Sequence, residues 1–356
     1  MALDHYYLNL AYHLALQNEG STAPNPSVGA VVVCGEQVVS YGYHARAGEA
    51  HAEVMALQQA GERARNATLY CTLEPCAHQG KTPPCVDAIS SAGVTRVVFG
   101  VKDLNPLVNG KGETLLRQRG IQVEQIRQSV IEKFYVPFFL TLQSSRPYVI
   151  AKVAMTLNGI ISPADRNSQW ITNESSLAWV HQLRAQCDGI LVGADTVLLD
   201  RPHLTVRAPV MERRPMRIVV DGRFKLDPEE CSLLESEEPI LICGSETASI
   251  ARENMWHQHG VRTLRFRNVA GLLNSLLELG LRKIVVEGGQ KIFTLFHTSG
   301  LIDEYIVMIA PRLITGRHFL NFLAGPEQSL VETQRYAIDP PIDLDGDLIV
   351  RLRKSA

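Results

Sequence analysis

The sequence has no long apolar run and no excess of charge of either sign. No stretch of its 356 residues approaches the run of about 18 apolar residues that a membrane helix needs, and the formal net charge is only −2. With 35 basic against 37 acidic residues, nothing favours a nucleic-acid backbone as a partner. We therefore expect a soluble protein that acts on small molecules, with neither a membrane nor a nucleic acid as its partner.

The N-terminus also lacks the basic leader of a signal peptide. The stretch "MALDHYYLNLAYHLALQ" carries Asp4 and His5. Its apolar residues recur with a helical period at Leu3, Tyr6, Leu10 and Leu14. This pattern predicts an amphipathic first helix.

The cysteines lack a paired pattern. There are seven, an odd number spread over a long chain, which favours the reducing cytoplasm over a disulfide framework. Those that lie in or beside apolar runs are expected in the core: Cys34, Cys187, Cys231 and Cys243.

The length exceeds what one hydrophobic core usually supports, so two domains are expected. The polar stretch "LQSSRPYV" at 142–149 places the boundary between residues 1–145 and residues 146–356. Both halves alternate short apolar strands with helical patterns, which predicts the α/β class, and the continuous apolar strands of the second half predict a mostly parallel sheet. Residues 225–238 are expected to form an acidic exposed connection without a chemical role.

The first half contains residues of the kinds that bind zinc. "HAE" places Glu53 two residues after His51, and "TLEPCAHQGKTPPC" contains Cys76 and Cys85. Zinc prefers nitrogen and sulfur ligands, and a catalytic site keeps a fourth position for water, whose proton a nearby carboxylate accepts. Since residues two apart do not share a helix face, His51 and Glu53 are expected at a helix start, as is Cys85 after Pro84.

Two other interpretations of these residues remain open. The cysteines and the histidine are ordinary core and helix-start residues in one, and His78 or Cys71 completes a closed structural zinc site in the other. The nine-position step from Cys76 to Cys85 also departs from the P-C-x-x-C pattern of nucleoside deaminases, because Gln79 stands where the second cysteine would fall.

Several motifs of the first half together resemble a known family. "PNPSVGAVVV", "HAE", "TLEPCAHQGKTPPC" and "KDLNPLVNGKG" are similar to the deaminase half of the bifunctional deaminase and reductase of riboflavin biosynthesis. The resemblance implies a cytidine-deaminase-like three-layer fold, zinc on His51, Cys76 and Cys85, and Glu53 as the proton donor. It also implies a substrate pocket made by Asn25, His44, Lys81, Asp103 and Asn105. Taken alone, the asparagines are equally typical of turns, and Lys81 of a solvated loop.

The second half lacks the G-x-G-x-x-G fingerprint of dinucleotide sites, although "VVEGGQKIFTLF" places two glycines between a strand and a helix. A glycine pair there also serves as a plain turn. Trp170 in "SQWIT" is able to stack on a flat ligand or to lie in the core, and Arg184 and Arg207 are able to bind phosphate or to be solvated. The residues alone do not decide between these roles.

Several motifs of the second half resemble the same family. "AKVAMTLNG", "SQWIT", "LRAQCDGILVGADTVLLDRPHLTVR" and "VEGG" are similar to the reductase half of the same family, which has a dihydrofolate-reductase-like fold. It implies that the substrate is held by Ser168, Arg184, Leu204, Arg207 and Glu287. It implies that NADPH is held by Ala154, Trp170, Thr196, Asp200, Gly222, Gly289, Gln290, Lys291, Ile292, Phe293, Thr294 and Leu295. Lys152 and Asp200 are the candidates for polarising the sugar, and departures from the family occur at Asn158, Arg201 and Gly222.

The resemblance thus implies zinc-dependent deamination of 2,5-diamino-6-(5-phosphoribosylamino)pyrimidin-4(3H)-one. It also implies a second reaction, the NADPH-dependent reduction of the ribosyl group of 5-amino-6-(5-phosphoribosylamino)uracil to ribityl. Two alternatives stay open: a deaminase of free nucleosides or bases with a repurposed second half, and a zinc-stabilised binding module without turnover. We also expect a homo-oligomer, although no motif defines its order.

Overall fold

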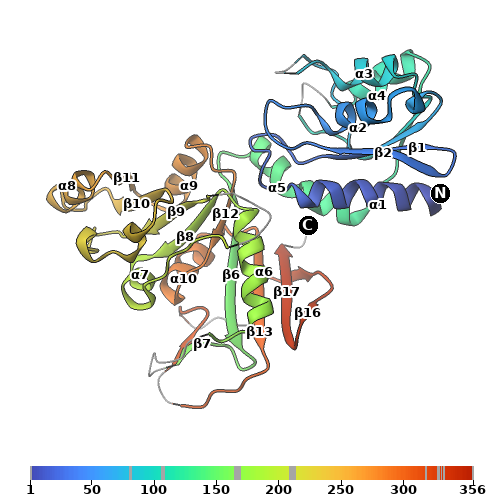
Figure 1. Cartoon of the computed structure of the whole chain (residues 1–356). Helices are drawn as coiled ribbons and strands as arrows, with labels where there is room; N and C mark the ends of the chain where they lie inside the picture. Colours follow the sequence, from blue (N-terminus) through green and yellow to red (C-terminus); the bar gives the residue numbers. More distant parts are fainter. Residues whose placement is uncertain are drawn as a thin grey trace. The chain divides into compact units, whose positions relative to one another are not determined.

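The computed structural model describes the chain as two compact units, Met1–Gln143 and Ser144–Ala356 (Figure 1). The described residues are 2–79, 82–105, 109–163, 170–207, 214–316, 319–326, 329, 331 and 333–354. Within these segments no helix has the length and hydropathy that crossing a membrane requires.

The first unit alternates helices and strands around a sheet with the order β2-β1-β3-β4-β5. Its helices are α1 Ala2–Gln17, α2 Ala52–Ala60, α3 Cys85–Ser91, α4 Lys111–Gln118 and α5 Ser129–Gln143, with a 3-10 turn at Gly61–Ala64. Its strands are β1 Gly29–Cys34, β2 Gln37–Tyr43, β3 Thr68–Leu73, β4 Arg96–Val101 and β5 Gln122–Gln125. β1 pairs antiparallel with β2 and β3, whereas β3, β4 and β5 run parallel.

Helices cover both faces of this sheet, which gives three layers (Figure 1). Successive strand residues point to opposite faces, so Val31 packs with Leu8 of α1 and Tyr135 of α5, whereas Val32 packs with Ala56 of α2 and Ile89 of α3. The two cores thus sandwich the sheet. The three-layer deaminase-like architecture is confirmed.

The second unit is built on a larger sheet. Its helices are α6 Glu174–Ala185, α7 Ala194–Asp200, α8 Ile250–Gln258, α9 Val269–Glu278 and α10 Gln290–Thr298, with 3-10 turns at Pro228–Glu230 and Ser232–Glu235. Its strands are β6 Tyr148–Thr156, β7 Ile160–Pro163, β8 Gly189–Gly193, β9 Met216–Val220, β10 Ile240–Ser245, β11 Arg262–Phe266, β12 Lys283–Val286, β13 Glu304–Ala310, β14 Phe319–Asn321, β15 Tyr336–Ile338, β16 Ile342–Leu344 and β17 Asp347–Lys354.

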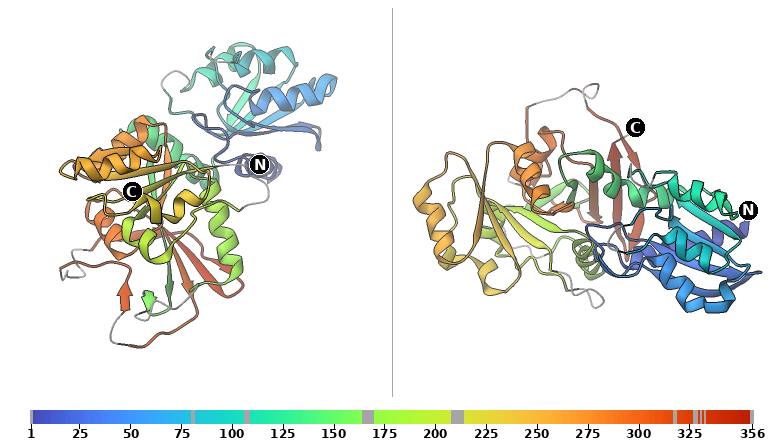
Figure 2. Two further views of the ribbon diagram at one scale, coloured as in Figure 1. Left: turned by 60° about the vertical axis from the view of Figure 1, so that its left-hand side comes forward. Right: turned by 90° about the horizontal axis from the view of Figure 1, so that it is seen from above.

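The order of this sheet is β11-β10-β9-β8-β12-β6-β13-β17-β15, with β16 also paired to β17 and β14 paired to β7 in a separate ribbon. The strands from β11 to β13 run parallel, and β17 runs antiparallel to β13. Buried aliphatic residues of these strands pack against α9 and α10, while α6 runs alongside β6 in Figure 1; Figure 2 gives two further views. The predicted mostly parallel sheet is confirmed.

Parallel strands end at one edge of the sheet, and open α/β sheets bind ligands beyond that edge. β8 leads there into α7 through Gly193, and β12 leads into α10. A Cβ on Gly193 would lie 2.6 Å from Cγ1 of Ile292, so glycine lets α10 approach the end of β8 this closely. Two strand-to-helix turns therefore lie side by side.

The structure corrects the expected face of the first helix. The helix is confirmed, but Leu3 and Tyr6 are 49% and 57% exposed. The buried face instead carries Asp4, Tyr7, Leu8, Ala11 and Ala15. Asp4 is able to lie on this buried face of α1 because Arg96 and Tyr70 donate hydrogen bonds to its Oδ1, at 2.6 and 2.9 Å.

Two further expectations were partly wrong. Cys34 is exposed, because it ends β1 at the tight turn into β2, whereas Cys187, Cys231 and Cys243 are buried as predicted.

Residues 225–238 are not a uniformly exposed connection. Leu226 and Leu233 are fully buried, and the buried Arg217 of β9 donates to Oγ of Ser236 at 2.8 Å. The acidic residues mark only the outer surface of a segment that packs on the sheet.

Candidate functional site

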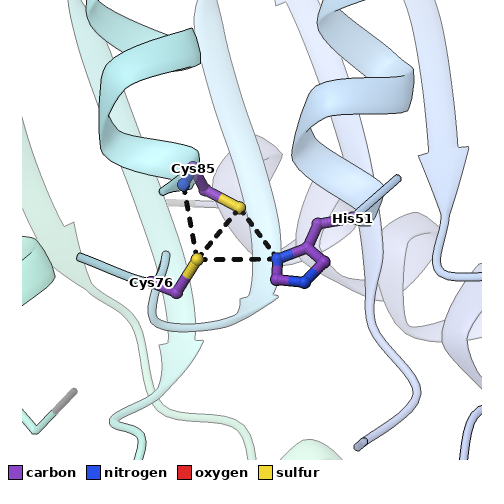
Figure 3. A group of neighbouring side chains, drawn as sticks. All are labelled: His51, Cys76 and Cys85. Carbon is purple, nitrogen blue, oxygen red and sulfur yellow. Dashed lines mark hydrogen bonds between the residues drawn. The ribbon is translucent and has the colours of Figure 1, made fainter. Parts of the chain in front are cut away.

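Three ligand-type side chains converge in the first unit (Figure 3). Nδ1 of His51 lies 3.1 Å from Sγ of Cys85 and 3.5 Å from Sγ of Cys76, and the two sulfur atoms are 3.4 Å apart. All three ligand atoms lie within 4.8 Å of one another. These are distances that one ion is able to span.

Two helix starts and a loop position these ligands. His51 is the N-cap of α2, and Cys85 is the first residue of α3, directly after Pro84, so both predicted helix starts are confirmed. The backbone N–H of Cys85 donates to Sγ of Cys76 at 3.3 Å. Helix N-termini favour negative charge, so they suit thiolate ligands.

The electrostatics fit zinc. The hydrogen bond from Cys85, helped by His51, lowers the pKa of the Cys76 thiol from 9.0 to about 4. Within the described chain the metal-ligand group takes in neither His78 nor Cys71, whose Sγ faces the carbonyl of Val98 at 3.8 Å. A set of one imidazole and two cysteines, with no fourth protein ligand among the described residues, matches a catalytic zinc site and not a closed structural one.

Glu53 is buried beside these ligands without belonging to the metal-ligand group. It lies in the first turn of α2, and its carboxyl shares a hydrogen bond with Cys85. Burial raises the pKa of Glu53 above 4.5, its ordinary value. A carboxyl whose pKa is raised in this way suits a group that must gain and lose a proton.

The structure brings two of the expected pocket residues to the metal ligands. Nδ2 of Asn25 lies 3.2 Å from Nε2 of His44, whose ring packs edge-on against that of His51 at 5.3 Å between centroids. Burial lowers the pKa of His44, which favours the neutral ring. We did not predict a role for Thr82, whose Oγ1 lies 3.2 Å from Nε2 of His51. Its place in "KTPPC", three residues before the ligand Cys85, was the feature of the sequence that could have indicated this contact.

Asp103 and Asn105 lie on the loop after β4. Oδ1 of Asp103 accepts a hydrogen bond from the backbone N–H of Asn105 at 2.9 Å. Burial raises the pKa of Asp103, and the nearby Cys76 acts in the same direction. Asp103 therefore lies within electrostatic reach of the metal ligands, and Lys81 lies outside the described residues.

Glu74 anchors this loop, a role that we did not predict. Its carboxylate accepts hydrogen bonds from the backbone N–H groups of Gly110 and Glu113, at 3.1 and 3.2 Å. A Cβ on Gly112 would lie 2.0 Å from the carbonyl oxygen of Pro75, so glycine is required for this approach. The features of the sequence that could have indicated this contact are the glutamate of "LEPC" and the two glycines of "NGKG".

The second unit holds a buried cluster of two cations around one carboxylate. Nε of Arg184 lies 2.7 Å from Oε1 of Glu287, and Nζ of Lys152 lies 3.5 Å from Oε2. Burial alone would raise the pKa of Glu287, but the charges of Arg184 and Lys152 outweigh it and lower that pKa from 4.5 to about 2. Burial in turn lowers the pKa of Lys152, so its proton is held less tightly than that of an exposed lysine.

The other expected substrate residues follow α7. Nη1 of Arg184 donates to the carbonyl of Thr205 at 3.2 Å, and the backbone N–H of Arg207 donates to Nδ1 of His181 at 3.2 Å. Leu204 is buried with φ +52°, an unusual conformation for a branched residue. These contacts link the segment to α6 and Glu287, and Ser168 lies outside the described residues.

The expected cofactor residues gather only in part. A Cβ on Gly289 would lie 3.9 Å from Oγ1 of Thr196, so the starts of α7 and α10 adjoin. Ile292 and Phe293 are buried in the core, which leaves their backbone as the available contact. The others are exposed or half-buried: Ala154, Trp170, Asp200, Gly222, Gln290, Lys291, Thr294 and Leu295. Trp170, 67% exposed, is not a core residue.

The three departures from the family have clear structural settings. Asn158 bridges Thr156 and Ile314, accepting from the first and donating to the second at 2.8 Å each. Arg201 ends α7 with φ +42° and lies 3.6 Å from Glu235. A Cβ on Gly222 would meet nothing within 4 Å, so open space adjoins the end of β9.

Comparison with known proteins covers both units. Residues 147–336 match the family RibD C-terminal domain, and residues 1–101 match the cytidine and deoxycytidylate deaminase zinc-binding region. The chain is 41% identical over 315 residues to riboflavin biosynthesis protein RibD of Aquifex aeolicus, covering 88% of each chain. It is 39% identical over 330 residues to the Escherichia coli protein of that name, covering 87% of this chain and 88% of that one.

Solved structures agree. RibD of Acinetobacter baumannii superposes with a TM-score of 0.87 at 34% identity, covering 100% of this chain and 99% of that one. A Thermotoga maritima protein is described as a diaminohydroxyphosphoribosylaminopyrimidine deaminase and 5-amino-6-(5-phosphoribosylamino)uracil reductase. It superposes with a TM-score of 0.86 at 31% identity, covering 99% of both chains.

Proposed function

The chain belongs to the RibD family of riboflavin biosynthesis proteins, and we propose that it carries out two successive reactions at two separate sites. It is a hydrolase and an oxidoreductase, with a zinc-dependent deaminase domain and a reductase domain that uses NADPH. We assign the deaminase to residues 1–145 and the reductase to residues 146–356.

The first reaction is the hydrolytic deamination of 2,5-diamino-6-(5-phosphoribosylamino)pyrimidin-4(3H)-one. His51, Cys76 and Cys85 would hold the zinc ion, which when bound would lower the pKa of a water at the site to about 7. Glu53 would accept one proton from the attacking water and deliver it to a ring nitrogen, and would then carry the proton of the added hydroxyl to the amino group, which leaves as ammonia. The raised pKa of Glu53 supports this role, since the group must be protonated between the two transfers.

The residues around the ligands position the substrate. We assign Asn25, His44, Asp103 and Asn105 to the pyrimidine and its ribose, and Lys81 to the phosphate. The contact of Asn25 with His44 and of His44 with His51 supports the first part of this assignment, because it brings these side chains to the metal ligands.

The second reaction reduces the ribosyl group of 5-amino-6-(5-phosphoribosylamino)uracil to ribityl. When bound, NADPH would supply the hydride that the opened ribose carbon accepts. Lys152, buried with a lowered pKa, donates a hydrogen bond or a proton to the sugar oxygen, and Asp200 assists. Ser168, Arg184, Leu204, Arg207 and Glu287 hold the substrate, and the turn from Gly289 to Leu295 holds the cofactor.

The observation that carries this proposal is the group of three ligand atoms within 4.8 Å beside a buried carboxyl that is not a ligand. A closed structural site has no use for such a carboxyl. Within the family, that arrangement supports chemistry in the first unit and not only binding.

One assay tests both reactions. Zinc-loaded protein, the phosphoribosyl diaminopyrimidinone and NADPH are mixed, and ammonia release and the loss of nicotinamide absorbance are followed together. We expect equal amounts of ammonia and oxidised NADPH at completion. Ammonia from cytidine or guanine, but none from the phosphoribosyl compound, would reject the proposal in favour of a nucleoside or base deaminase.

We further propose that the protein works in the cytoplasm as a homo-oligomer, with small molecules as its ligands and neither nucleic acid nor membrane as a partner. The seven free cysteines among the described residues support a reducing compartment. Light scattering of the purified protein tests the assembly, because a monomeric mass at micromolar concentration would reject it.

A further inference from the structure

One carboxylate in the second unit forms ion pairs with two lysines from separate segments, a helix start and a loop. Asp195 lies in the first turn of α7, and Nζ of Lys291, in the first turn of α10, lies 2.8 Å from its Oδ2. Nζ of Lys225, from the loop after β9, forms an ion pair with Oδ1 of the same carboxylate. Residues 195, 225 and 291, far apart in the sequence, thus meet at one point.

This point adjoins the expected cofactor residues. Asp195 precedes Thr196, Lys291 follows Gly289 by two positions, and Lys225 follows Gly222 by three. The starts of α7 and α10 approach closely, as the 3.9 Å from a Cβ on Gly289 to Oγ1 of Thr196 indicates. Open space lies beside Gly222, with nothing within 4 Å of a Cβ there. The Asp195 carboxylate and its two lysines therefore adjoin the expected cofactor residues at the carboxyl edge of the sheet.

The charges at this point are not balanced. Two ammonium groups share one carboxylate, and their hydrogen bonds lower the pKa of Asp195, so the group carries a net positive charge. The side chains of Lys291 and Lys225 are 86% and 42% exposed. The buried cations Lys152 and Arg184 differ, because at 14% and 15% exposure they are held against Glu287. The exposed lysines are free to turn towards an added anion.

We propose that Lys225 and Lys291 bind the 2′-phosphate of NADPH and so select NADPH over NADH. This inference rests on the proposed reductase function. The two cofactors differ only in that phosphate, and each ammonium has two N–H donors left after its bond to Asp195. Two lysines on one phosphate form charge-assisted hydrogen bonds, which are stronger than neutral ones.

Affinity measurements on the zinc-loaded full chain separate this subsite from general cofactor binding. The probes are NADPH, NADH, 2′,5′-ADP and 5′-ADP, each titrated by calorimetry. The variants are Lys225→Ala, Lys291→Ala and the double variant, with Lys225→Arg and Lys291→Arg as charge-conserving partners. Lys354→Ala is the matched control, since the ammonium of this exposed lysine of the same unit donates to the carbonyl of Gly300 and, within the described segments, to no carboxylate. Exposed ion pairs contribute little to stability, so these variants are expected to fold.

We expect the double variant to bind NADPH and 2′,5′-ADP at least about 10-fold more weakly, a loss typical of charge-assisted hydrogen bonds to phosphate. Its affinities for NADH and 5′-ADP should stay within about twofold, as should all affinities of Lys354→Ala and of the arginine variants. Equal losses for NADPH and NADH would overturn the proposal, because the lysines would then hold the shared part of the cofactor. Unchanged NADPH affinity would overturn it as well.

Asp195→Asn is expected to change the affinity for NADPH in the opposite direction. The carboxylate competes with an added phosphate for the same ammonium groups, so its neutralisation is expected to tighten NADPH and 2′,5′-ADP severalfold and to leave NADH nearly unchanged. Weaker NADPH binding by this variant would contradict the proposal. Failure of the unaltered protein to bind NADPH at all would instead reject the reductase function itself.

Discussion

The guanidinium of Arg184 donates two hydrogen bonds to Glu287, from Nε to Oε1 at 2.7 Å and from Nη2 to Oε2 at 2.9 Å. This paired contact joins α6 to the end of β12 inside the second unit. The carboxylate also faces Lys152, so a single buried anion holds both cations. Removing the carboxylate of Glu287 would leave two positive charges buried without this anion. Glu287 therefore contributes to stability as well as to the proposed binding of substrate.

The first prediction concerns the pH dependence of stability. The pKa of Glu287 is about 2 in the folded chain against 4.5 for the free side chain, so its stabilisation is present above pH 4.5 and is lost as the pH falls towards 2. Glu287→Gln should lower the free energy of unfolding at pH 7 by about 3 kcal/mol and flatten its decline between pH 4.5 and 3. All three tryptophans, at 170, 179 and 256, lie in the second unit, so their fluorescence in urea reports this unit alone. Parallel pH profiles for the two proteins would contradict the assignment.

The second prediction concerns the metal. Cys85→Ser is expected to hold well under one zinc per chain after dialysis and to release no ammonia, because two ligands with an open site bind zinc weakly. Plasma emission spectroscopy measures the zinc. Cys71→Ser is the matched control, since Cys71 is another buried cysteine of this unit that lies outside the metal-ligand group. A Cys85→Ser protein that kept full zinc and full ammonia release would refute the ligand assignment.

The third prediction concerns Glu74. Glu74→Ala removes the acceptor of two backbone N–H groups, so Gly110 and Glu113 should lose their fixed position, at a cost of about 1–3 kcal/mol in stability. We expect KM for the diaminopyrimidinone to rise about tenfold. NADPH oxidation with the deaminated uracil should not change. Glu62→Ala, at an exposed ion pair with Arg65, should alter neither reaction; an unchanged KM in Glu74→Ala would show that the loop does not bind substrate.

The fourth prediction concerns Gly222. Gly222→Ser fits without a clash, since a Cβ there meets nothing within 4 Å, and restores a hydroxyl donor that the family commonly has. Calorimetry should show NADPH binding about two- to tenfold tighter, the usual effect of one added hydrogen bond. Gly112→Ala, whose Cβ would lie 2.0 Å from a carbonyl oxygen, should instead destabilise the first unit. Weaker NADPH binding by Gly222→Ser would place the cofactor elsewhere.

Local features of the site could be predicted from the sequence. Helix starts depend on residues close in the chain, so His51 before α2 and Cys85 after Pro84 were predictable. The α/β class and the parallel sheet followed from apolar strands alternating with helices.

Features that depend on distant contacts could not be predicted in this way. The buried face of α1 depends on Arg96, which lies 92 residues after its partner Asp4. Glu74 anchors residues 36 and 39 positions away, and Asp195 gathers lysines 30 and 96 positions away. No local periodicity carries such information.

If the first unit deaminates the substrate before the second unit reduces it, Glu53→Gln should block the first reaction and spare the second. The variant is given NADPH and either the phosphoribosyl diaminopyrimidinone or the deaminated uracil, and absorbance of the nicotinamide is followed. We expect NADPH oxidation with the diaminopyrimidinone to fall at least about 100-fold, whereas the rate with the uracil should equal that of the unaltered protein. Oxidation of NADPH at an undiminished rate with the diaminopyrimidinone would contradict this expectation.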